Sequence, residues 1–216
     1  MSTIIGTPIR TLADLLERLG RVPLERIRFH PPPGTATEQD VLEIAAREDR
    51  LCELIDGVLV EKPVGYGESI LALFLGRMLC NFVAPRNLGH VTGEQGMLRL
   101  FPGLVRIPDV AFASWDRFPQ RRWTGEPIPV LVPDLTVEVL SESNISAEMR
   151  NKIGEYFLAG VRLVWLVDLR SRSATVFTTS ENYITLHEPD TLDGGSVLPG
   201  FTLPLRELFA ELDRHG

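Results

Sequence analysis

The chain has 216 residues and a formal net charge of −7, with 44% hydrophobic and 24% charged residues. This composition is typical of one folded domain of ordinary size and excludes an intrinsically disordered chain. The acidic balance excludes the broadly basic surface with which many proteins bind nucleic acid nonspecifically, although it leaves room for a local basic groove.

The sequence predicts a protein of the cytoplasm that does not enter a membrane. Its first residues, MSTIIGTPIR, lack the basic start and apolar run of a secretory signal. The most apolar segment, residues 70–83, is too short to cross a bilayer. The two cysteines, Cys52 and Cys80, lie in apolar patterns, and we expect both to be buried free thiols.

Two short helices are predicted near the N-terminus. Thr11 and Thr37 are each suited to cap an amphipathic run, and the intervening HPPPGTAT excludes regular structure. We expect a helical extension over residues 1–50 and a main domain over residues 51–216, which together form one compact unit. We interpret the extension as a lid or packing brace without a catalytic role.

The main domain opens with LCELIDGVLVEK, which predicts a hairpin around Asp56-Gly57 because Asp-Gly favours a tight turn. Glu53 alternates with apolar residues in the first strand. Spacing alone favours its interpretation as an edge-strand charge that reaches solvent. A helix over residues 69–83 and several short strands follow.

Residues 133–160, PDLTVEVLSESNISAEMRNKIGEYFLAG, are the centre of the prediction. They read as a strand and then a helix, and the strand is apolar on both faces except for Glu138. A buried charge requires a partner, a proton or a metal. The helix carries Lys152 and Tyr156 on one face. With the apolar strand at 161–169, these residues predict an α/β fold with a mixed central β-sheet flanked by helices.

A second carboxylate could meet Glu138. Asp109 follows Pro108 at the start of an earlier strand, far enough upstream to lie on a neighbouring one. Asp134 begins the same strand as Glu138, but at about 13 Å it is too far away to share a metal. Two carboxylates and a lysine are the minimum for Mg²⁺-assisted hydrolysis of a phosphodiester.

Plainer interpretations stay open at this point. Lys152 could form a surface pair with Glu148, or an internal ion pair with Glu138 that has no metal. The arginines and aromatics of residues 115–129 could contact nucleic acid, but we favour a solvated loop whose tryptophans pack against the domain. The sequence has no glycine-rich phosphate loop and no zinc-type histidine spacing.

Four stretches resemble, in order, the pattern of the Uma-two family in the PD-(D/E)xK restriction-endonuclease-like superfamily. They are ELIDGVLVE, RIPDVAF, PDLTVEVLSESN and KIGEYFLAGVRLVWLVD. The resemblance implies a restriction-endonuclease-like core, Mg²⁺ with Mn²⁺ as a substitute, and cleavage of DNA by a homodimer. The alternative is a catalytically inactive nuclease-fold module that binds or regulates.

The resemblance also implies roles for four residues. Asp109 and Glu138 would hold the metal with assistance from Glu53, and Lys152 would orient the attacking water. The superfamily usually places its lysine two residues after the glutamate, where this chain has Leu140.

Three further positions bear on the resemblance. Tyr156 and Asp168 match family positions that suit supporting roles. Glu142 departs from the pattern, because the family usually has Ser-Pro-Ser where this chain has Ser-Glu-Ser.

Overall fold

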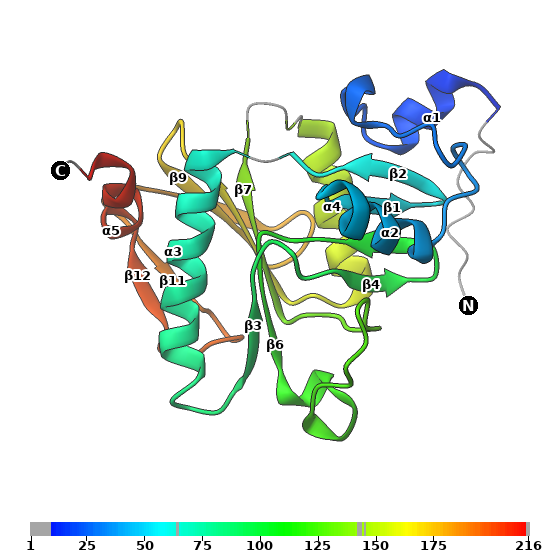
Figure 1. Ribbon diagram of the computed structural model, residues 1–216. Coiled ribbons are helices and arrows are strands. Elements are labelled where there is room, and N and C mark those ends of the chain that lie inside the picture. Colours follow the sequence, from blue (N-terminus) through cyan, green and yellow to red (C-terminus); the bar gives the residue numbers. More distant parts are fainter. Residues whose placement is uncertain (1–9, 64, 142–143, 145, 215–216) are drawn as a thin grey trace.

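The strands of the computed structural model form one large sheet, one smaller sheet and a two-stranded ribbon (Figure 1). The structure describes residues 10–63, 65–141, 144 and 146–214. The large sheet has the order β10–β9–β8–β7–β6–β3, and the smaller one β2–β1–β5–β4. Only β7 and β8 run parallel among the neighbours in these two sheets, so within the described residues the central sheet is mixed, as predicted.

The strands are short. Those of the large sheet are Gly89–Thr92 (β3), Val110–Ser114 (β6), Leu135–Leu140 (β7), Leu163–Asp168 (β8), Ser173–Phe177 (β9) and Tyr183–His187 (β10). Those of the smaller sheet are Cys52–Ile55 (β1), Val58–Glu61 (β2), Leu98–Phe101 (β4) and Leu104–Arg106 (β5). The ribbon consists of Thr191–Asp193 (β11) and Thr202–Pro204 (β12).

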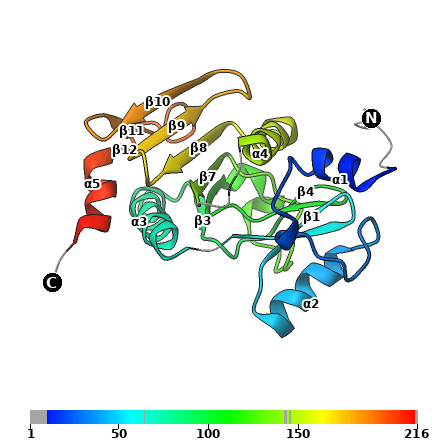
Figure 2. The ribbon, with the colours of Figure 1, turned by 90° about the horizontal axis from the view of Figure 1, so that it is seen from above.

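Helices cover both faces of the large sheet. The α-helices are Leu12–Arg18 (α1), Glu38–Glu48 (α2), Tyr66–Val83 (α3), Ser146–Ala159 (α4) and Leu205–Ala210 (α5). Single 3₁₀ turns occupy Leu24–Arg26, Trp115–Arg117, Pro119–Arg121 and Glu211–Asp213. Seen from above, α3 and α4 lie on opposite sides of β7 and β8 (Figure 2).

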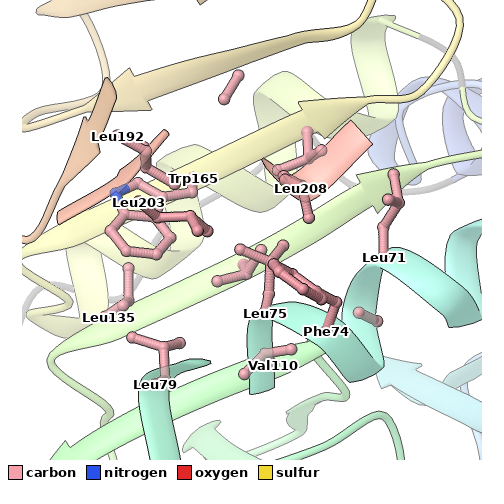
Figure 3. Close-up of a cluster of buried hydrophobic side chains, with 14 of the residues drawn as sticks. Leu71, Phe74, Leu75, Leu79, Val110, Leu135, Trp165, Leu192, Leu203 and Leu208 are labelled. Atoms are coloured by element: carbon pink, nitrogen blue, oxygen red, sulfur yellow. The ribbon is translucent and has the colours of Figure 1, made fainter. Parts of the chain in front are cut away.

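The alternation of side chains along β7 gives each face its own core. Leu135, Val137 and Val139 join the cluster formed with α3 and α5, part of which is drawn in Figure 3. On the other face, Ile153 and Tyr156 of α4 belong to a second cluster that also contains residues of the smaller sheet. Glu138 therefore belongs to the α4 side of the sheet.

Both N-terminal helices form where their caps predict. The Asp14 N–H donates a hydrogen bond to the Thr11 hydroxyl at 3.1 Å, and the Thr37 N–H donates one to the Asp40 carboxylate at 2.7 Å. The buried side chains of α1 and α2 join the cores of the sheets rather than a core of their own. The division of the chain at residue 50 stays a prediction.

The β1–β2 hairpin turns at Asp56-Gly57, as predicted. Both residues have positive φ, 50° and 76°, which suits the type I′ turn of a two-residue hairpin.

Cys52 is buried, and burial raises the pKa of its thiol to about 11. Cys80 is exposed, so the prediction of a second buried thiol is wrong; the residue lies on the solvent side of α3.

The segment after β6 is a surface loop with two 3₁₀ turns. Trp115 packs against the His90 ring at 4.6 Å between centroids, whereas the Trp123 side chain is half exposed. One tryptophan therefore packs as expected and one does not.

In the described part of the chain, no helix is both long and apolar enough to span a membrane.

Candidate active site

Glu138 lies within β7 and faces α4. It is only 5% exposed, and both carboxylate oxygens have a partner. Oε2 accepts a hydrogen bond from the Lys152 ammonium at 2.9 Å, and Oε1 accepts one from the Tyr156 hydroxyl at 2.5 Å. Lys152 and Tyr156 reach the same carboxylate because they are one helical turn apart on α4. Lys152 is therefore buried, and it does not form the surface pair with Glu148 that its spacing allows.

Glu53 reaches the same lysine from β1. Its Oε1 lies 2.9 Å from Lys152 Nζ and accepts the Ile107 N–H at 3.0 Å. Its Oε2 accepts from Arg106 at 2.6 Å. Glu53 is 3% exposed, so the interpretation of a solvent-facing edge charge is wrong. The physical reason is that β1 has neighbours on both sides, β2 and β5.

Arg106 is a buried charge that the sequence did not single out. It ends β5, and its Nε also donates to Glu155 of α4 at 2.8 Å. Burial disfavours the charged guanidinium, but the carboxylates of Glu155 and Glu53 outweigh this effect and raise the pKa of Arg106. Arg106 thus links the smaller sheet to α4.

Asp109 is held directly beside Glu138. Its backbone N–H donates to the Val137 carbonyl at 3.1 Å, and its Oδ2 accepts the Val139 N–H at 2.6 Å. These two contacts fall on the residues before and after Glu138. The Pro-Asp carboxylate and the buried strand carboxylate therefore lie in the same pocket, close enough for Asp109 to repel Glu138, which is the juxtaposition that the sequence analysis required.

Lys62 is a second lysine in the site, and sequence reasoning missed it. Its Nζ lies 2.7 Å from Asp109 Oδ1 and donates to the Ile107 carbonyl at 2.8 Å. Its side chain is only 6% exposed. The sequence indicated its place in the site only by its position: Lys62 directly follows β2, and β2 pairs with the strand that carries Glu53.

The two glutamates of the site differ in electrostatic environment. Burial opposes ionisation of Glu53, but the charges of Lys152 and Arg106 outweigh burial and hold its pKa well below the usual range. For Glu138, burial is the largest effect and raises the pKa; repulsion from Asp109 and Glu53 adds to it, and the attraction of Lys152 and Lys62 offsets only part of the rise. Burial thus makes the negative charge of Glu138, next to Asp109, less favourable than that of Glu53.

All four candidate catalytic residues line one pocket. The lining comprises Arg26, Glu53, Lys62, Pro63, Gly65, Glu68, Ser69, Glu94, Asp109, Glu138, Val139, Ser141, Asn144, Glu148 and Lys152. Within the described ranges, no set of three acidic, histidine or cysteine side chains converges as a ready metal cage. Mg²⁺ commonly takes one or two carboxylates and fills its other positions with water, so Asp109 and Glu138 fit it in ligand type and in charge.

The remaining predicted residues lie elsewhere. Asp134, at the far end of β7, accepts from the Ser114 N–H and from Arg117, both at 2.9 Å, and is separate from the pocket. Asp168 accepts from backbone N–H groups in the turn after β8. Glu142 lies outside the described residues.

Comparison with known proteins decides the family. Residues 38–206 match the model of the Uma2 family, which is described as "Putative restriction endonuclease". The chain belongs to the Uma2 family. The match begins at the first residue of α2, so the Uma2 region excludes α1 and the segment that follows it. No curated protein matches the chain.

A solved structure supports the fold of this Uma2 member. It comes from Anabaena variabilis ATCC 29413 and is described as a putative nuclease belonging to DUF820. The alignment has a TM-score of 0.66 and 21% sequence identity, and covers 76% of this chain and 92% of that one. The restriction-endonuclease-like α/β fold implied by the sequence is thereby confirmed.

Proposed function

We propose that the chain is a metal-dependent endonuclease that hydrolyses phosphodiester bonds of DNA. Asp109 and Glu138 would hold Mg²⁺, for which Mn²⁺ could substitute, and Lys152 would orient the attacking water. The observation that carries the proposal is that Asp109 is hydrogen-bonded to the backbone of Val137 and Val139, the two neighbours of Glu138 in β7. The Uma2 family and the nuclease-like fold agree with it.

The chemistry of Lys152 is set by its two carboxylate partners. Burial disfavours the ammonium, but Glu138 and Glu53 outweigh burial and raise the pKa of Lys152 above its usual value. A lysine that stays protonated cannot accept a proton, so Lys152 would act by orientation and charge. An ammonium has three N–H donors, and two are directed at carboxylates. The third would donate to the attacking water or to a phosphate oxygen.

Other residues of the pocket would support this group. Glu53 and Arg106 would fix Lys152 from the smaller sheet, and Tyr156 would hold the Glu138 carboxylate in one orientation. Bound Mg²⁺ would supply charge neutralisation at the phosphate and lower the pKa of water. The role of Glu53 as a third metal ligand stays a prediction. Its contacts with Lys152 and Arg106 favour a different role, in which Glu53 holds Lys152 in place.

A nuclease-fold module without turnover is the second candidate. The observation that favours it is that cations of the chain already contact each carboxylate, Lys62 on Asp109 and Lys152 on Glu138. In that case the pocket would bind nucleic acid or a partner without cleaving it. The homodimer and the location in the cytoplasm likewise stay predictions.

Titration of Mg²⁺ and Mn²⁺ by calorimetry, with plasmid cleavage assayed on the same samples, tests the proposal. We expect wild type to bind metal and to nick or linearise the plasmid, and Asp109→Asn to lose both properties. Asp116→Asn is the matched control, because Asp116 is exposed and pairs with Arg121 away from the pocket. Metal binding without cleavage of DNA would favour the binding module, and no metal binding by wild type would overturn the metal site.

A further inference from the structure

The segment that precedes the Uma2 match packs against the first turns of α4. Arg26 ends a 3₁₀ turn, and its guanidinium contacts the Glu148 carboxylate through both terminal nitrogens, at 3.0 and 2.7 Å. Both side chains are more than nine-tenths buried. A buried bidentate pair of this kind fixes orientation as well as distance, because both groups are planar. The Arg26–Glu148 pair therefore restrains the direction in which α4 starts.

Arg26 also joins α4 to the smaller sheet. Its Nε donates to the Glu61 carbonyl of β2 at 2.8 Å. β2 pairs with β1, and β1 carries Glu53, which contacts Lys152. Glu148 lies one helical turn before Lys152 on α4. A single arginine thus bridges the strand pair that holds one side of Lys152 and the helix that carries it.

A glycine of the same segment touches the α4 backbone. Gly20 has φ +72°, and a Cβ at this position would lie 2.7 Å from the Glu148 Cα and 2.8 Å from its nitrogen. Real Cβ atoms do not approach backbone this closely. A side chain at Gly20 would therefore push the first turn of α4 away, so the close approach is independent evidence that the segment presses on α4.

From these contacts we infer that the N-terminal segment is a clamp that positions α4, and with it Lys152. We define the clamp as Gly20 and Arg26. This inference rests on the proposed function, since it assigns positioning residues to that site from outside the family match. It also changes the interpretation of the extension, which we expected to have no catalytic role. Glu138 stands on β7 and Asp109 directly precedes β6, so the clamp reaches these two residues only through Lys152, which contacts Glu138.

Steady-state cleavage kinetics with Arg26→Gln and Arg26→Lys test the clamp. We expect Arg26→Gln to lower kcat by about 10- to 100-fold, as small displacements of catalytic groups do, with KM and metal affinity within about twofold of wild type. Arg26→Lys keeps the charge and should recover part of the loss. Arg28→Gln is the control, because Arg28 belongs to the same segment but pairs with Glu48 and Glu61 instead of α4.

A second pair of variants tests the clamp without altering a charge. Gly20→Ala should lower kcat in the same way, whereas Gly34→Ala should not. Gly34 also has positive φ, +91°, but a Cβ there meets nothing within 4 Å. Both variants therefore carry the strain of a left-handed residue, and only Gly20→Ala collides with α4. This pair decides the question if Arg26→Gln fails to fold.

Hydrogen exchange of α4 amides gives a readout that does not depend on activity. We expect faster exchange in α4 of Arg26→Gln and Gly20→Ala, with β7 unchanged. Unchanged exchange in α4, or unchanged kcat beside an active wild type, would overturn the clamp. A rise in KM with constant kcat would also overturn it and would indicate direct substrate binding by Arg26. An inactive wild type would contradict the proposed function, and the exchange rates would still decide whether the segment positions α4.

Discussion

Lys62 competes for the carboxylate that we assign to the metal. Its ammonium lies 2.7 Å from Asp109 Oδ1, in a position where the side chain is almost fully buried. Opposite charges attract strongly in such a site, so a divalent cation must displace this contact or share it. If the pocket binds metal as proposed, its affinity would depend on Lys62 as well as on the carboxylates.

Replacement of Lys62 should tighten metal binding. We expect Lys62→Met to lower the Kd for Mg²⁺ by about tenfold, which corresponds to about 1.4 kcal/mol, because Asp109 loses its competing charge. Calorimetric titration measures this change, and Lys62→Arg, which keeps the positive charge, is the control. An equal Kd in wild type and Lys62→Met would show that the lysine does not compete.

The residues that sequence reasoning found and missed differ in one physical respect. Glu138 and Lys152 lie on consecutive elements, so periodicity alone places them on facing surfaces. Arg106 contacts Glu53 because β1 and β5 pair in a register that sets Leu54 opposite Val105. That register depends on contacts between distant segments, and no local pattern encodes it.

At the scale of elements, the start of β7 is tied to the end of β6 by Asp134. Its carboxylate accepts from the Ser114 N–H, and Arg117 lies 2.9 Å away on the other oxygen. Burial opposes ionisation, but the Ser114 and Arg117 contacts outweigh it and hold the pKa of Asp134 below its usual value. A group with a lowered folded-state pKa stabilises the fold above its unfolded pKa and loses that contribution as the pH falls.

The contribution of Asp134 should be visible in the pH dependence of stability. At pH 7 we expect Asp134→Asn to reduce the free energy of unfolding by about 2 kcal/mol, the scale of hydrogen bonds to a charged group. The difference should shrink below about pH 4, where the unfolded-state carboxyl becomes protonated and wild type begins to lose its advantage. Urea denaturation at pH 7 and at pH 3 measures it. A difference that stays constant with pH would mean that the charge of Asp134 is irrelevant.

The elements themselves were largely predictable because their signals are local. The Thr11 and Thr37 caps, the Asp56-Gly57 turn and the strand–helix–strand unit each follow from a few adjacent residues. The orientation of α3 was less predictable, because its apolar face is wide. Cys80 follows the buried Leu79, and nothing in the sequence indicates that Cys80 faces solvent. Which side of a helix is covered depends on the sheet beneath it.

At the scale of the whole molecule, the charge is unusual for a protein that would act on a polyanion. The net charge is −7, and the three cations that line the pocket, Arg26, Lys62 and Lys152, are paired with carboxylates. Binding of DNA would then use few contacts between a free cation and a phosphate. Few counterions are released by such binding, which makes it weakly dependent on salt.

The salt dependence of DNA binding should accordingly be shallow. For the Asp109→Asn variant and a labelled duplex, we expect the logarithm of the binding constant to fall against the logarithm of salt concentration with a slope of about −3 or shallower. Fluorescence anisotropy at several salt concentrations gives this slope. A slope near −8, as expected for about nine phosphate contacts, would reveal a basic surface that the charge balance hides.

The contact between Arg26 and Glu148 joins residues 122 positions apart. During synthesis at about 5 to 20 residues per second, Arg26 is made roughly 6 to 25 s before its partner. Glu53, Asp109 and Glu138 also precede Glu148 in the chain. A nascent chain thus carries every acidic residue of the proposed site before the clamp can close on α4. If cleavage needs Lys152 and the clamp positions it, a nascent chain reaches full activity only after synthesis has passed α4.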